Sequence, residues 1–110
     1  MAAEIQAFGT LYLDERDSDG VQGRPLQMSH RLMAKAHDGS IWYGFVIVGS
    51  DREVLEVGKS AQIGIAFLDG EGAKKAFPIN KPIRFGDGVR TRGSIELQRY
   101  VSGEEEGNVT

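Results

Sequence analysis

Short runs of alternating residues, separated by glycine-containing turns, are the feature that most constrains how this 110-residue chain can fold. From Ile5 to Leu13, aliphatic side chains recur at alternate positions, which places them on one face of a β-strand. Phe8 and Tyr12 fall on the opposite face, so both sides of this strand are expected to be partly covered. The run from Ile41 to Val48 is aromatic and β-branched, and it is too short for a helix. The local pattern therefore predicts strands.

The middle of the chain repeats this pattern. A strand that begins at Leu26 and the run at 41–48 are predicted to form a hairpin around the turn HDGS at 37–40. A further alternating strand, AQIGIAFL, follows at 61–68 and is expected to be broken by the turn DGEG at 69–72. One hairpin and one further strand thus account for this part of the chain.

The last third is expected to hold two more strands. Pro78 and Pro82 suit an edge or a crossing segment, because proline cannot donate a hydrogen bond to a strand ladder. The turn GDG at 86–88 separates PIRF from a long closing strand that ends near Tyr100. With about six strands, 15 glycines and no convincing helix, the chain is predicted to be all-β, a barrel or a sandwich. A closed barrel has the advantage that it leaves no exposed sheet edge.

The composition is that of one globular domain. The chain is 40% hydrophobic and 26% charged, with a formal net charge of -3 and no cysteine, so neither a disulfide framework nor a thiolate metal site is possible. No signal peptide is evident, and no stretch approaches the roughly 20 apolar residues that span a bilayer. We expect a cytoplasmic protein with a barrel at residues 1–101 and an acidic, disordered tail at 102–110.

The acidic stretch DERDSDG, which begins at Asp14, resembles the opening of a calcium-binding loop. Such a loop needs oxygen ligands at its first, third and fifth positions, glycine at the sixth and glutamate at the twelfth. Counted from Glu15, the twelfth position is Leu26, the first is Glu rather than Asp, and no helix-forming pattern flanks the stretch. We therefore predict no metal site here, but a solvated connection rich in turn-forming residues that ends at Arg24.

Four phrases of the sequence resemble the C-terminal β-barrel domain, domain III, of elongation factor Tu and related translation GTPases. They are GVQGRP at 20–25, SHRLM at 29–33, EVLEVGKSAQI at 53–63 and PIRFGDGVRTRGSI at 82–95. The resemblance covers roughly residues 5 to 100. The chain departs from the family pattern in having no proline after Arg31, Gly58-Lys59 in place of Gly-Asp, and a longer lysine-containing segment at 69–81.

This resemblance implies a six-stranded Greek-key barrel that stands alone. The family's barrel contacts both RNA backbone and its own GTPase domain. The present chain has no phosphate-binding loop of the form G-x-x-x-x-G-K-[ST], so we expect no nucleotide hydrolysis.

Basic residues concentrate at the closing hairpin. Residues 73–100 carry seven Lys and Arg against two acidic residues. Arg90 and Arg92 have the spacing of neighbours on one strand face, and their planar guanidinium groups suit phosphate or carboxylate oxygens. The partner-binding residues that we predict are Arg24, Arg31, Arg84, Arg90 and Arg92. These arginines would serve a protein partner, RNA phosphates, or internal pairing with local acids.

Chemistry beyond binding has little support in the sequence. His30 and His37 have opposite parity on a regular strand, so they are not expected to form a catalytic pair or a shared metal site. Trp42 and Tyr43 offer stacking platforms for bases, although core packing is the favoured interpretation for Trp42. We predict no catalytic residue and no cofactor.

The predicted function is a non-enzymatic protein-interaction module, with self-association as one form of it. Binding of tRNA or other structured RNA is the alternative, which the negative net charge disfavours. A third hypothesis is an enzyme or small-molecule carrier with a site in the barrel mouth. An interior filled by apolar side chains would oppose it.

Overall fold

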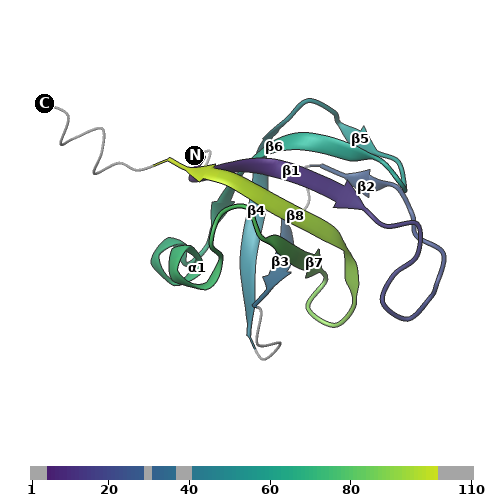
Figure 1. Ribbon diagram of the computed structural model, residues 1–110. Coiled ribbons are helices and arrows are strands. Elements are labelled where there is room, and N and C mark those ends of the chain that lie inside the picture. The colour runs from purple at the N-terminus through teal and green to yellow at the C-terminus, as the bar shows by residue number, and fades with distance from the viewer. Residues whose placement is uncertain (1–4, 29–30, 37–40, 102–110) are drawn as a thin grey trace, which may run out of the picture.

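The computed structural model describes residues 5–28, 31–36 and 41–101 of the chain, and it forms a closed antiparallel barrel (Figure 1). The six barrel strands are β1 (Ala7–Leu13), β3 (Arg31–Lys35), β4 (Trp42–Ser50), β6 (Ser60–Phe67), β7 (Pro82–Gly86) and β8 (Thr91–Tyr100). They follow the order β1-β6-β4-β3-β7-β8 around the barrel. The predicted all-β barrel is thereby confirmed. The histidines, the turn at 37–40 and the tail at 102–110 lie outside the described residues.

The connectivity of the strands is a Greek key. Strands β3, β4 and β6 are successive antiparallel neighbours, and β1 pairs with β6 instead of β3. The predicted hairpin is present as the β3–β4 pair, in which Ala34 lies opposite Tyr43. The closing hairpin is present as β7–β8, in which Ile83 lies opposite Ile95.

Alternate side chains along the strands fill the barrel, as the sequence pattern predicts. Every second residue of β1, from Ala7 to Leu13, is buried, and the residues between them are half-buried or exposed. In β8 the buried positions are Thr91, Gly93, Ile95 and Leu97. The interior is thus built mainly from aliphatic and aromatic side chains, so apolar burial supplies the main stabilisation of the barrel.

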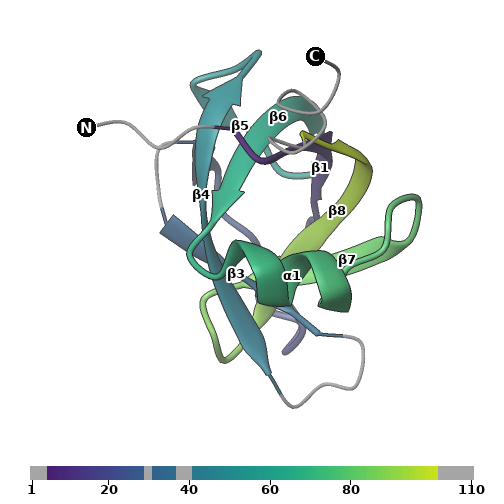
Figure 2. The same ribbon diagram turned by 90° about the vertical axis from the view of Figure 1, so that its left-hand side faces the viewer.

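A helix stands where the sequence analysis predicted only a turn. The side chain of Asp69 accepts a hydrogen bond from the Gly72 N–H at 3.0 Å and caps helix α1 (Gly70–Ala76). Lys74 and Lys75 occupy its last turn, where cations interact favourably with the helix dipole. The prediction of no helix was wrong because two glycines obscured this capping signal. Figure 2 looks onto one end of the barrel and shows α1 in front of the strands.

Phe77, at the end of α1, closes this end of the barrel. Its ring is fully buried, stacks on Phe67 at a centroid distance of 5.7 Å and meets the Tyr43 ring edge-on at 5.3 Å. The Tyr100 hydroxyl donates a hydrogen bond to the Phe77 carbonyl at 2.6 Å. Aromatic packing and hydrogen bonds from the Tyr100 hydroxyl to the Phe77 and Ala73 carbonyls therefore hold the helix against the strands.

The opposite end of the barrel carries a small separate sheet. Strands β2 (Leu26–Gln27) and β5 (Val54–Leu55) pair with each other, and Leu26 and Leu55 are fully buried. The single strand predicted to begin at Leu26 is therefore divided, with β2 in this sheet and β3 in the barrel.

The stability of the fold is expected to fall at strongly alkaline pH, because the Tyr100 hydroxyl ionises there. Burial raises the pKa of Tyr100 to about 12, from an ordinary value of 10.0. Because the pKa of the folded state is the higher one, the neutral hydroxyl contributes stability that is complete below about pH 10 and lost as the pH rises through about 12. We expect the tyrosinate absorbance to show a step at about pH 12 that Tyr100→Phe lacks. A step that persists in this variant would contradict the assignment.

Candidate functional site

The acidic loop between β1 and β2 packs onto the closing hairpin. The Asp14 N–H donates to the Arg92 carbonyl at 2.9 Å, and the Ser18 N–H donates to the Thr91 carbonyl at 3.0 Å. The Ser18 hydroxyl in turn accepts a hydrogen bond from the Thr91 N–H. Segments about 70 residues apart in the sequence thus form one surface, at the right-hand side of Figure 1.

Two of the predicted arginines pair with acids of this loop. Arg84 forms an ion pair with Asp14, and the Arg90 Nε lies 2.6 Å from an oxygen of Asp19. The bond to Asp19 raises the pKa of Arg90. Internal pairing, one of the three roles considered from the sequence, therefore describes these two arginines. Exposed pairs of this kind contribute little stability, so their effect is mainly to orient the loop on the hairpin.

Two aspartates support turns, one in the β1–β2 loop and one in the β7–β8 hairpin. Asp17 Oδ1 accepts hydrogen bonds from the N–H groups of Asp19 and Val21, each at 2.9 Å. Asp87 Oδ1 likewise accepts from the N–H groups of Arg90 and Val89, which hold the pKa of Asp87 below its ordinary value. Within the described ranges, no three acidic or histidine side chains gather in a way that suits a metal ion.

Arg24 and Arg92 lie together without a carboxylate partner among the described residues. The Arg92 Nη2 donates to the Arg24 carbonyl at 2.9 Å, and Arg92 is half-buried. Burial and the nearby positive charge of Arg24 lower the pKa of Arg92, and the attraction of Asp87 only partly offsets them. Both arginines line a cavity of about 350 Å³. Arg90 lines it as well. Arg84 does not line the cavity, but it forms an ion pair with Asp14, which does.

Arg31 belongs to a different part of the surface. It is exposed at the start of β3, where it lies opposite Val46 of β4. Arg24, Arg90 and Arg92 are therefore brought together by the fold, and Arg31 is not part of their cavity.

The outer side of β3 and β4 carries an apolar cluster, a feature that the sequence analysis did not single out. On this side Gly44 lies between Met33 of β3 and Leu68, whose N–H donates to the Gly44 carbonyl. Val46 and Trp42 are the next outward residues of β4 in the two directions. We call Met33, Trp42, Val46 and Leu68 the β3–β4 face. The run of consecutive apolar residues at 41–48 is the sequence signal that could have indicated a strand covered on both sides.

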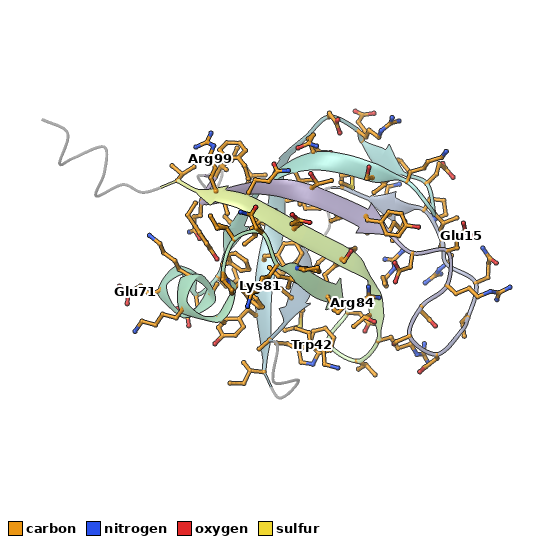
Figure 3. The ribbon with its side chains drawn as sticks, viewed as in Figure 1. Glu15, Trp42, Glu71, Lys81, Arg84 and Arg99 are labelled. Carbon is orange, nitrogen blue, oxygen red and sulfur yellow. The ribbon has the colours of Figure 1, made fainter. Side chains whose placement is uncertain are left out.

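Trp42 is a correction to the sequence analysis, which favoured core packing for it. Its neighbours Tyr43 and Phe45 point into the barrel, so strand alternation turns Trp42 outward. Its ring is partly exposed, with the Lys35 Nζ at 5.6 Å from the ring centroid. Figure 3 shows Trp42 on the same lower side of the barrel as Arg84.

Positive charge borders the β3–β4 face. Lys35 lies between Trp42 and Arg84 in the strand pairing, and Arg31 lies beside Val46. In the part of the chain that the structure describes, neither Lys35 nor Arg31 has a carboxylate partner. The face therefore combines an apolar centre with a basic margin.

The barrel interior is occupied by large side chains, including Phe45, Phe67, Phe77 and Phe85, which are buried in one core cluster. Such filling opposes a ligand site along the barrel axis, so the surface features are the candidate sites. Among the described residues, no helix has the length and apolar character to cross a membrane.

Comparisons of the chain with protein-family models, with curated proteins and with solved structures give no match. The resemblance to domain III of elongation factor Tu therefore rests on the sequence phrases described above.

Proposed function

We propose that this barrel is a non-enzymatic protein-interaction module that docks through the β3–β4 face. The observation that carries the proposal is the outward placement of Met33, Trp42, Val46 and Leu68 on strands whose inward side already forms the core. Leu68 is 64% exposed, although its side chain lies against Gly44. A cluster of outward apolar residues that includes a tryptophan is typical of a protein interface.

The resemblance to domain III supports the same role. In that family the barrel packs against a neighbouring domain of its own chain. Where no such neighbour covers the barrel, that surface is available to a separate protein. The proposal places this chain in translation-related binding.

The basic margin of the face favours a partner surface that carries acidic residues. Arg31 and Lys35 would contact carboxylates that flank an apolar cluster on the partner. A second copy of this chain would bring the same cations toward one another, which disfavours self-association. RNA is a weaker candidate, because Arg84 and Arg90 are paired with acids and the net charge is -3.

Capture experiments with matched variants test this proposal. The tagged wild-type chain, Trp42→Ala, Leu68→Asp and the control Ile79→Ala are compared, since Ile79 is an exposed aliphatic residue outside the face. We expect wild type and Ile79→Ala to retain a protein that Trp42→Ala and Leu68→Asp lose. With that protein purified, Trp42→Ala is expected to raise Kd about 30-fold, or about 2 kcal/mol.

Three results would overturn the proposal. The first is capture that is equal for wild type and Trp42→Ala. The second is a concentration-dependent dimer mass that Leu68→Asp abolishes, which would assign the face to self-association. The third is binding of tRNA at physiological salt that Arg90→Glu/Arg92→Glu abolishes, which would assign the function to RNA.

A further inference from the structure

We propose that the cavity between the β1–β2 loop and the β7–β8 hairpin binds a small phosphate monoester that carries hydroxyl groups, as a sugar phosphate does. Arg24 and Arg92 would hold the phosphate, and Asp17 and Asp87 would accept hydrogen bonds from the hydroxyls. This site is separate from the β3–β4 face, so the inference does not depend on the proposed function.

The guanidinium N–H donors of Arg24 and Arg92 that have no acceptor among the described residues favour an anionic ligand. A guanidinium has five N–H donors, yet the only hydrogen bond of the Arg92 side chain to described residues is the one from Nη2 to the Arg24 carbonyl. The Arg24 side chain makes none among these residues. Two neighbouring guanidinium groups, one of them half-buried, are unfavourable together unless an anion lies between them. A phosphate dianion offers enough oxygens to accept from both.

The acids of the cavity restrict the ligand to a small hydroxylated molecule. Oδ1 of Asp17 and Oδ1 of Asp87 accept backbone hydrogen bonds, whereas Oδ2 of each carboxylate accepts none from the described residues. These oxygens are available to hydroxyl donors. The same negative charges would repel the further phosphates of a nucleic acid strand, so a single phosphate group is favoured.

The cavity is held in place before any ligand binds. The Gly23 N–H donates to the Glu15 carbonyl at 2.7 Å, and Arg16 forms a β-bridge with Gln22, so the loop is closed just before Arg24. On the other wall, the bond to Asp19 fixes Arg90. Because these walls are already ordered, less conformational entropy is lost on binding, which favours affinity for a small ligand.

Titration of the isotope-labelled protein with glucose 6-phosphate tests the site. NMR would follow the Nε–Hε signals of Arg24 and Arg92 together with the backbone amides. We expect saturable binding with a Kd below about 1 mM, and shifts confined to the two arginines, the β1–β2 loop and the β7–β8 hairpin. Arg24→Gln and Arg92→Gln should each weaken binding at least about tenfold.

The controls test separately the position of the site, the need for the phosphate and the need for the sugar. Arg52→Gln removes an exposed arginine outside the cavity and should bind like wild type. Glucose should not bind, and inorganic phosphate should bind more weakly than the ester. Because the wild-type arginine signals report binding directly, the test remains decisive even if a variant fails to fold.

Four outcomes would overturn the inference. They are the absence of saturation, equal weakening by Arg52→Gln, equal affinity for inorganic phosphate and the ester, and tighter binding of a single-stranded RNA to the same residues at physiological salt.

Discussion

Replacing Phe77 with alanine is expected to lower the free energy of unfolding by about 3–5 kcal/mol, the range for removing a fully buried aromatic ring. The ring is 0% exposed and lies against Phe67 and Tyr43 at the end of the barrel. Its loss leaves a cavity that the strands cannot close, because hydrogen bonding around the barrel fixes their spacing. Chemical denaturation measures the change, and hydrogen exchange should show faster opening of α1.

Ile79→Ala is the matched control, since its side chain lies two residues later and is 44% exposed. We expect it to change the free energy of unfolding by less than about 1 kcal/mol. A Phe77→Ala variant as stable as this control would show that α1 does not close the barrel.

Replacing Gly86 with alanine is expected to destabilise the fold by about 3 kcal/mol, at the upper end of the range for overpacking. A Cβ at this position would lie 1.8 Å from the Arg90 carbonyl oxygen and 2.9 Å from the Thr91 Cα. Both are backbone atoms, one directly before β8 and one in its first residue, so no side-chain rotation relieves the overlap. The β7–β8 hairpin would have to separate where the strand register shifts between Phe85 and Gly86.

Gly49→Ala provides the comparison in β4. Its Cβ would meet only Ile5 Cδ1, at an ordinary contact distance of 3.6 Å, and we expect a change below about 1 kcal/mol. Thermal and denaturant unfolding of the two variants measure the difference. Equal stability of Gly86→Ala and Gly49→Ala would contradict the close approach of the two strands.

The two substitutions also affect different parts of the barrel. Gly86 lies in the hairpin that carries Arg90 and Arg92, whereas Phe77 closes the barrel beside α1. At temperatures where both variants remain folded, we expect Gly86→Ala to impair the arginine cavity more than Phe77→Ala does. The β3–β4 face and the cavity are two candidate sites that share no residue.

Local residue patterns determined the fold class of this protein. Alternation placed Ile95 and Leu97 in the core, and the GDG turn at 86–88 marked the closing hairpin, because both signals depend on residues close together in the chain. Two glycines obscured α1, although Asp69 three residues before Gly72 is a local capping signal. Clustering of basic residues indicated Arg84, Arg90 and Arg92 as candidate site residues, whereas Arg24 and Arg31 were chosen from the resemblance to domain III.

Only the tertiary structure decided which arginines have partners. Arg90 contacts Asp19 across 71 residues, and Arg84 contacts Asp14 across 70, pairings that no local pattern specifies. The outward orientation of the Trp42 side chain depended on the register of β4 within the closed barrel. Periodicity shows that a strand has two faces, but barrel closure determines which face is inside and which loops meet, since these depend on contacts between segments distant in sequence.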